Sequence, residues 1–172
     1  MGLAITPQSR CALTVLIPFY NEAGNIAPLL DEVHTALDGV DYEVVCVNDA
    51  SSDTTAQELV AASAARPGRV FVLTHVKRRG KSAALFTGLR SSRGDWVQLL
   101  DGDGQNDPAD ARRIWDLVAA KDENPALGIV CARGTSRNDS GFKWLQSRVA
   151  NAIRRFCLPD RATNTGCGLK LI

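Results

Sequence analysis

The sequence predicts an α/β domain in which helices cover both faces of a mostly parallel sheet. Short runs rich in valine, isoleucine and leucine alternate along the chain with longer segments whose apolar residues recur at helical spacing. The short runs are apolar at nearly every position, which is typical of parallel strands buried on both faces. A chain of 172 residues is long enough for one such domain with a substantial core.

The expected strands are short apolar runs that end in polar residues or proline. The first strand is dominated by valine and isoleucine, and we expect Pro18 to close it. The five predicted strands are 12–20, 42–49, 69–75, 95–101 and 127–133.

The expected helices follow these strands one by one, at 25–37, 52–65, 81–92, 106–120 and 142–158. Ser52 or Asp53 is the expected cap of the second helix. In the fourth, Asp107 can cap, Pro108 suits the first helical position, and Asp110 favours the helix N-terminus.

The composition excludes several classes of protein. The formal net charge is +1, which does not favour general binding of nucleic acid. No run of about 18 apolar residues is present to span a membrane, and the first dozen residues lack the apolar core of a secretory signal. The five cysteines are scattered without metal-site spacing, which favours a reducing compartment such as the cytoplasm.

Polar side chains follow three of the expected strands, in "PFYNE", "VNDASSD" and "LLDGDGQND". Ligands of open α/β sheets bind beyond the carboxyl ends of the strands, so these segments could form one site. Asp101, Asp103 and Gln105 alternate there and offer the oxygen ligands that suit Mg²⁺ or Mn²⁺. Gly102 and Gly104 lack side chains that would keep a ligand away.

Simpler explanations of the same segment are available. Asp-Gly pairs are common in plain turns, and Asp107 has a separate task as a helix cap. Two sharper alternatives fail. An EF-hand loop would need glycine where Asn106 stands and glutamate where Arg112 stands, and a phosphate-binding P-loop would need glycine in place of His75.

Taken together, the motifs resemble glycosyltransferase family 2, which has the GT-A fold. The resemblance rests on "VLIPFYNEAGNI", "VVCVNDASSDTT", "RRGKSAALFTGL", "LLDGDGQNDP", "CARGTSRNDS" and "NTGCGLK", which occur in this order at the expected element boundaries. Within the family, the chain looks most like dolichyl-phosphate mannose synthases and bacterial polyprenyl-phosphate glycosyltransferases.

The resemblance implies a role for each matching residue. Asp49 matches the carboxylate that holds the nucleotide base, and Asp101 and Asp103 match the family's D-x-D pair, with Gln105 joining Asp103 at the metal. Other matching residues are expected to bind the donor or the acceptor phosphate. They are Pro18, Tyr20, Glu22, Lys81 and Gly102 for the nucleotide-sugar, and Arg133 and Arg137 for the diphosphate or the acceptor phosphate.

The resemblance also implies an inverting, metal-dependent hexosyltransferase that moves a sugar from a UDP- or GDP-sugar to a polyprenyl phosphate. Asn164 stands where relatives commonly carry the aspartate that serves as base. Asparagine cannot accept a proton, but a lipid phosphate is already largely ionised at neutral pH and needs less help from a base. Two alternatives stay open, an inactive or truncated relative that still binds nucleotide-sugars, and a nucleotidyltransferase. "PFYNEAGN" lacks the basic residues that the latter would need.

We expect one catalytic domain over 1–172, without the C-terminal continuation that relatives usually have, acting at the cytoplasmic face of the cell membrane. The expected helix at 142–158 carries an apolar stripe with basic residues beside it. This pattern fits a helix on a membrane surface, but it fits an ordinary helix packed on the sheet better.

Overall fold

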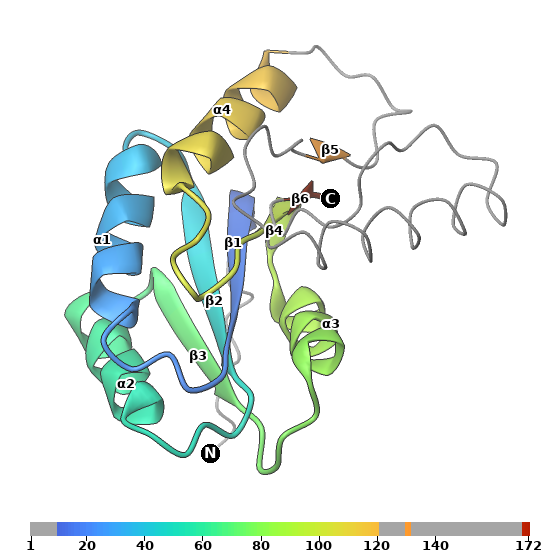
Figure 1. The fold of residues 1–172 in the computed structure, drawn as a ribbon. Coiled ribbons are helices and arrows are strands. Elements are labelled where there is room, and N and C mark those ends of the chain that lie inside the picture. The colour runs from blue at the N-terminus through green and yellow to red at the C-terminus, as the bar shows by residue number, and fades with distance from the viewer. Residues whose placement is uncertain (1–9, 121–129, 132–169) are drawn as a thin grey trace, which may run out of the picture.

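The computed structural model describes residues 10–120, 130–131 and 170–172 (Figure 1). These residues form one six-stranded sheet with the order β3-β2-β1-β4-β6-β5. Four strands are parallel, namely β1 (Cys11–Phe19), β2 (Tyr42–Asn48), β3 (Val70–Thr74) and β4 (Gly94–Leu99). The two-residue strand β6 (Lys170–Leu171) pairs antiparallel with both β4 and β5 (Val130–Cys131).

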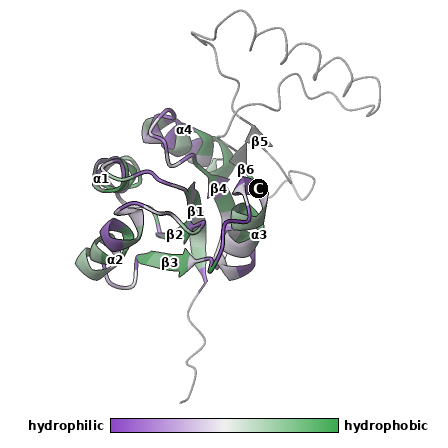
Figure 2. Cartoon of the chain, turned by 60° about the horizontal axis from the view of Figure 1, so that its bottom comes forward, coloured by the Kyte–Doolittle hydropathy of each residue, from purple (hydrophilic) through white to green (hydrophobic). Residues whose placement is uncertain are grey.

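Helices cover both faces of this sheet, as the sequence predicts. The helices α1 (Ile26–Ala36), α2 (Thr55–Ala65) and α4 (Pro108–Ala119) lie on one face, and α3 (Lys81–Ser91) lies on the other (Figures 1 and 2). Each face has its own core, because side chains alternate along a strand. In β1, Val15 and Ile17 enter the core beneath α1, whereas Leu16 packs toward Ala84 of α3.

Local details differ from the predicted boundaries. Pro18 does not close β1, which continues to Phe19, so the strand loses one backbone donor near its end. The residue before α2 is Thr54, and Asp53 instead accepts a hydrogen bond from the Thr55 backbone N–H (3.0 Å). Strand β4 ends at Leu99, two residues before its predicted end at Asp101.

The predicted start of α4 is confirmed, because the Asp107 carboxylate accepts from the Ala109 backbone N–H (2.8 Å) and Pro108 is the first helical residue. Strand β6 was not predicted, since two residues carry no periodic signal. The helix expected at 142–158 and most of the strand expected at 127–133 lie outside the described residues. Among the residues that the structure describes, no helix has the length and apolar character needed to cross a bilayer.

Candidate nucleotide-sugar site

The loops that follow the four parallel strands surround a pocket of about 210 Å³ at the carboxyl edge of the sheet. Four carboxylates that follow three of the strands line it, together with Arg78 from the loop between β3 and α3 and Lys81 at the start of α3. The residues that line the pocket are Pro18, Phe19, Tyr20, Glu22, Asp49, Arg78, Gly80, Lys81, Ala84, Asp101, Gly102 and Asp103. The convergence expected from the three polar strand ends is therefore present.

Asp49 lies just after β2 and is only 3% exposed. Its carboxylate accepts hydrogen bonds from His75 Nδ1 (2.7 Å) and from the backbone N–H groups of Arg79 (2.8 Å) and Gly80 (2.7 Å). Burial alone would raise the pKa of Asp49, but these hydrogen bonds outweigh it and hold the pKa below its ordinary value. Asp49 is thus a charged anchor for the loop that frames the pocket.

The loop after β1 is held by the start of α2. The backbone N–H groups of Glu22 and Ala23 donate to Thr55 Oγ1 (2.9 Å) and Asp53 Oδ2 (3.2 Å). Gly24 N–H donates in the same way to Glu58 Oε2 (2.9 Å). These side chains accept hydrogen bonds from backbone N–H groups that have no partner in a strand or helix. The backbone beside Tyr20 and Glu22 is therefore fixed at the edge of the pocket.

Tyr20 and Arg78 meet across the pocket edge. The Arg78 guanidinium lies 3.9 Å from the centre of the Tyr20 ring, within the range of a cation–π contact. Both side chains line the pocket. The sequence predicted a role at the site for Tyr20 but not for Arg78. A basic residue four positions after the end of β3 gives no local signal that it will contact an aromatic ring from the loop after β1.

The D-x-D segment, Asp101, Gly102 and Asp103, lines the same pocket. Asp101 Oδ1 accepts from Lys81 Nζ (2.5 Å), and Asp103 Oδ1 accepts from the backbone N–H of Gln105 (3.1 Å). A Cβ atom on Gly102 would lie 2.8 Å from the Pro18 carbonyl oxygen and 2.7 Å from the Phe19 ring. The segment can therefore approach β1 this closely only with glycine at that position.

The residues of this segment fit a divalent cation. The Lys81 ammonium already occupies one Asp101 oxygen, which shows that the carboxylate binds positive charge in this geometry. Within the described ranges, no group of three histidine, cysteine, aspartate or glutamate side chains converges to hold a metal. A cation held by Asp101, Asp103 and the Gln105 amide would thus need further oxygen ligands, which substrate phosphates commonly supply.

The structure brings together the predicted residues Pro18, Tyr20, Glu22, Asp49, Lys81, Asp101, Gly102 and Asp103. Gln105 is exposed beside the pocket and does not line it. The predicted residues Arg133, Arg137 and Asn164 lie outside the described residues. His75, which the sequence singled out only as the residue that rules out a P-loop, lies between Asp49 and α3. Its ring is hydrogen-bonded to Asp49 Oδ1 (2.7 Å) and to Thr87 Oγ1 (2.9 Å).

Comparison with known proteins identifies the family and the fold of the chain. The sequence pattern of glycosyl transferase family 2 matches residues 14–171. The chain is 34% identical over 161 residues to an undecaprenyl-phosphate 4-deoxy-4-formamido-L-arabinose transferase from Edwardsiella ictaluri, a match that covers 92% of this chain and 48% of the relative. The chain spans about half the length of the curated relatives it matches.

Two solved structures are similar to this one. A mannosyltransferase from Pyrobaculum calidifontis in complex with GDP-Man and Mn²⁺ is 35% identical, with a TM-score of 0.50 over 56% of this chain and 29% of that chain. Glucosyl-3-phosphoglycerate synthase from Mycobacterium tuberculosis has a TM-score of 0.69 at 19% identity, over 94% of this chain and 56% of its own. The expected GT-A fold is confirmed by this likeness. With the family pattern matched over nearly its whole length, the chain belongs to glycosyl transferase family 2.

Proposed function

We propose that this chain transfers a glycosyl group from a nucleotide-diphospho-sugar to a polyprenyl phosphate at the inner face of the cell membrane, with the help of Mg²⁺ or Mn²⁺. The observation that carries the proposal is the pocket in which Asp49, Asp101 and Asp103 meet Arg78 and Lys81. The named activity of the curated relatives, which use undecaprenyl phosphate, supports the choice of acceptor.

The donor would lie along the pocket from Asp49 to the D-x-D segment. Tyr20 and Arg78 form a flat, charged platform at one edge, which suits a nucleobase and the phosphate beside it. Asp49 would keep the Arg79–Gly80 backbone in place beneath the nucleotide, through the hydrogen bonds that it accepts from that backbone. Binding of the nucleotide would therefore depend on Asp49 in two ways, because Asp49 lines the pocket and also holds the loop of Arg79 and Gly80 in place.

The leaving diphosphate would lie beside Asp103 and Lys81. A divalent cation held by Asp101, Asp103 and Gln105 would stabilise the negative charge that grows on the diphosphate as the sugar leaves. Lys81 donates to Asp101 and lines the same pocket, which supports a role for its ammonium in holding a phosphate oxygen. Arg133 and Arg137 are the proposed partners of the acceptor phosphate, and Asn164 leaves that phosphate to attack without a protein base.

The metal site is tested by donor binding. We expect UDP- or GDP-sugars to raise the melting temperature of the chain, and Mn²⁺ to enlarge that rise. In the Asp103→Asn variant the Mn²⁺-dependent part should disappear, because one hard anionic ligand becomes a neutral amide. The measurement is thermal shift with each donor, with and without Mn²⁺.

Asp107→Asn is the matched control for this variant. Asp107 is four residues away and caps α4, and asparagine caps a helix about as well as aspartate does. The control should keep the full Mn²⁺ effect. An unchanged Mn²⁺ effect in Asp103→Asn would remove the metal site from the proposal. Donor binding without sugar transfer to a short-chain polyprenyl phosphate would instead favour a binding protein without turnover.

A further inference from the structure

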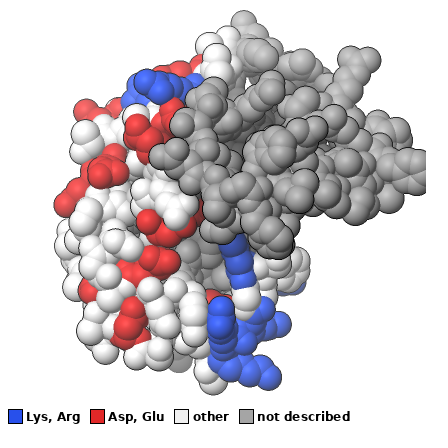
Figure 3. Space-filling view, viewed as in Figure 1, with Lys and Arg blue, Asp and Glu red and all other residues white. Residues whose placement is uncertain are grey.

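Positive charge is concentrated in one part of the chain. Between His75 and Gly94 the sequence contains no aspartate or glutamate, and it contains six basic residues, Lys77, Arg78, Arg79, Lys81, Arg90 and Arg93. Lys81 and Arg93 are paired with Asp101 and Glu43, and Arg78 lies on Tyr20. Basic side chains gather over the loop between β3 and α3 at the lower edge of Figure 3, whereas acidic side chains gather over the α1 and α2 side.

Apolar side chains are exposed beside these cations. Val76 is fully exposed at the tip of the loop, and Phe86 on the outer side of α3 is 62% exposed. Arg79, Phe86 and Arg90 line one shallow groove on α3, and the Arg90 guanidinium lies 5.9 Å from the centre of the Phe86 ring. We call this surface the loop–α3 face, and it consists of Val76, Lys77, Arg79, Phe86, Leu89 and Arg90.

The loop that carries Val76 is firmly held at both ends. His75 before it bonds Asp49 (2.7 Å) and Thr87 (2.9 Å), and the backbone N–H groups of Arg79 and Gly80 after it bond Asp49. Val76 is therefore presented to solvent by an anchored backbone. Full exposure of a valine there costs free energy that packing on a neighbour would recover, so the position is a candidate contact surface.

We propose that the loop–α3 face docks on an anionic phospholipid bilayer. Lys77, Arg79 and Arg90 would lie at the level of the lipid phosphates, and Val76 and Phe86 would enter the region just below them. This inference rests on the proposed function, because Gly80 and Lys81 of the same loop line the pocket. Docking here would place the pocket beside the bilayer that holds a lipid-phosphate acceptor. A nucleic acid would use the cations and the Phe86 ring, but it has no use for exposed Val76 and Leu89.

The test is co-sedimentation of the whole chain with vesicles. One set contains phosphatidylcholine alone, and the other contains equal amounts of phosphatidylcholine and phosphatidylglycerol. The wild type should bind the anionic vesicles and release them as salt is raised. Removal of a cation in Lys77→Ser or Arg90→Ser should weaken binding about fivefold each. Val76→Asp should weaken it more, since it removes an apolar contact and adds a repelled charge.

Matched controls are available on the opposite face. Val60 on α2 is 65% exposed, so Val60→Asp makes the same change away from the loop–α3 face. Arg113→Ser on α4 is the control for Arg90→Ser. These controls should bind anionic vesicles like the wild type. A melting curve of each variant checks that it is folded, and Val76→Ser is a second, milder variant at the loop position.

Three results would overturn the inference. The first is equal binding of the wild type to both kinds of vesicle, and the second is binding of the loop variants that equals that of their controls. The third is binding of a single-stranded oligonucleotide to this face without any binding of vesicles. Donor-induced thermal shift, measured without vesicles, is the separate readout for the proposed function. If vesicle binding depends on Val76 while no nucleotide-sugar binds, the docking face stands and the proposed function fails.

Discussion

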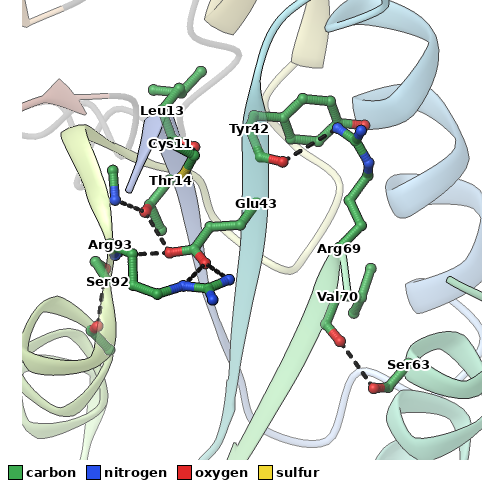
Figure 4. Close-up of polar contacts among 12 residues, drawn as sticks. Cys11, Leu13, Thr14, Tyr42, Glu43, Ser63, Arg69, Val70, Ser92 and Arg93 are labelled. Atoms are coloured by element: carbon green, nitrogen blue, oxygen red, sulfur yellow. Dashed lines mark hydrogen bonds and ion pairs between the residues drawn. The ribbon is translucent and has the colours of Figure 1, made fainter. Parts of the chain in front are cut away.

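Two buried carboxylates, Glu43 and Asp49, lie at opposite ends of strand β2, and different groups stabilise their charges. Glu43, which is 2% exposed near the amino end, accepts from Thr14 Oγ1 (2.8 Å) and from Arg93 Nε (2.6 Å) and pairs with the rest of that guanidinium (Figure 4). Asp49, just beyond the carboxyl end, accepts instead from an imidazole and two backbone N–H groups of a loop. No arginine or lysine side chain is paired with it in the part of the chain that the structure describes.

The difference indicates that Glu43 contributes to stability only, whereas Asp49 contributes to both stability and the pocket. The Glu43–Arg93 pair is a closed arrangement in which a strong cation and a hydroxyl satisfy the carboxylate, and it fastens the chain after α3 to the sheet. Asp49 fastens the loop of Arg79 and Gly80, and at the same time it lines the pocket. The amino edge of the sheet should therefore respond to mutation through stability alone, and the carboxyl edge through stability and donor binding together.

The largest effect is expected at the amino edge. Arg93→Leu would leave the Glu43 carboxylate buried without its cation, which should lower the free energy of unfolding by about 3–5 kcal/mol. Urea denaturation gives this value. Arg113→Leu, which removes an exposed pair with Asp110, is the control and should cost less than about 1 kcal/mol. Equal losses in the two variants would mean that the Glu43 network is no more than a surface contact.

A middle-sized effect is expected from two glycines that lie against β1. A Cβ atom on Gly94 would lie 2.4 Å from the Thr14 backbone N, and one on Gly102 would lie 2.8 Å from the Pro18 carbonyl oxygen. Because backbone atoms cannot move aside cheaply, each change to alanine should cost about 1–3 kcal/mol of stability. Only Gly102→Ala should also weaken donor binding measured by calorimetry. A similar loss of donor affinity in Gly94→Ala would contradict the separation of the two edges.

The smallest effect concerns Asp49 and pH. Because its pKa is lowered by folding, Asp49 stabilises the protein above its ordinary pKa of 3.8, and this contribution is lost as the pH falls through the lower folded value. Asp49→Asn should cost about 1–2 kcal/mol at neutral pH, since one loop donor loses its acceptor. The gap between the two proteins should narrow below about pH 4. A gap that is constant across this range would show that the charge of Asp49 does not stabilise the loop.

Much of the fold could be predicted because its signals are local. The apolar run over Val15–Ile17 favours a strand that is buried on both faces of a sheet. Asp107 and Pro108 indicate a helix start locally, because aspartate caps a helix and proline suits its first position. The positions of Asp49, Asp101 and Asp103 at one edge follow from their place after parallel strands. The limits of β1 and α2 were less predictable, because Pro18 and Asp53 can each serve more than one local structure.

The partners of the pocket residues could not be predicted in the same way. No role was predicted for His75, and nothing near it in the sequence indicates that it would contact both Asp49 and Thr87. Arg78 and Tyr20 are separated by two strands and two helices, and so are many pairs that do not meet. Lys81 was expected to hold the donor, and its contact with Asp101 became visible only in three dimensions.

The sequence by itself determined the α/β alternation, the carboxyl edge as the place of the site, and the family to which the chain belongs. These follow from periodicity and from motifs whose residues are neighbours along the chain. The tertiary structure decided which buried carboxylate received a cation, which basic side chains face the pocket, and which face of α3 is exposed beside it. The physical reason is that burial and pairing depend on how separate elements pack, and one residue type in one local pattern can have several such environments.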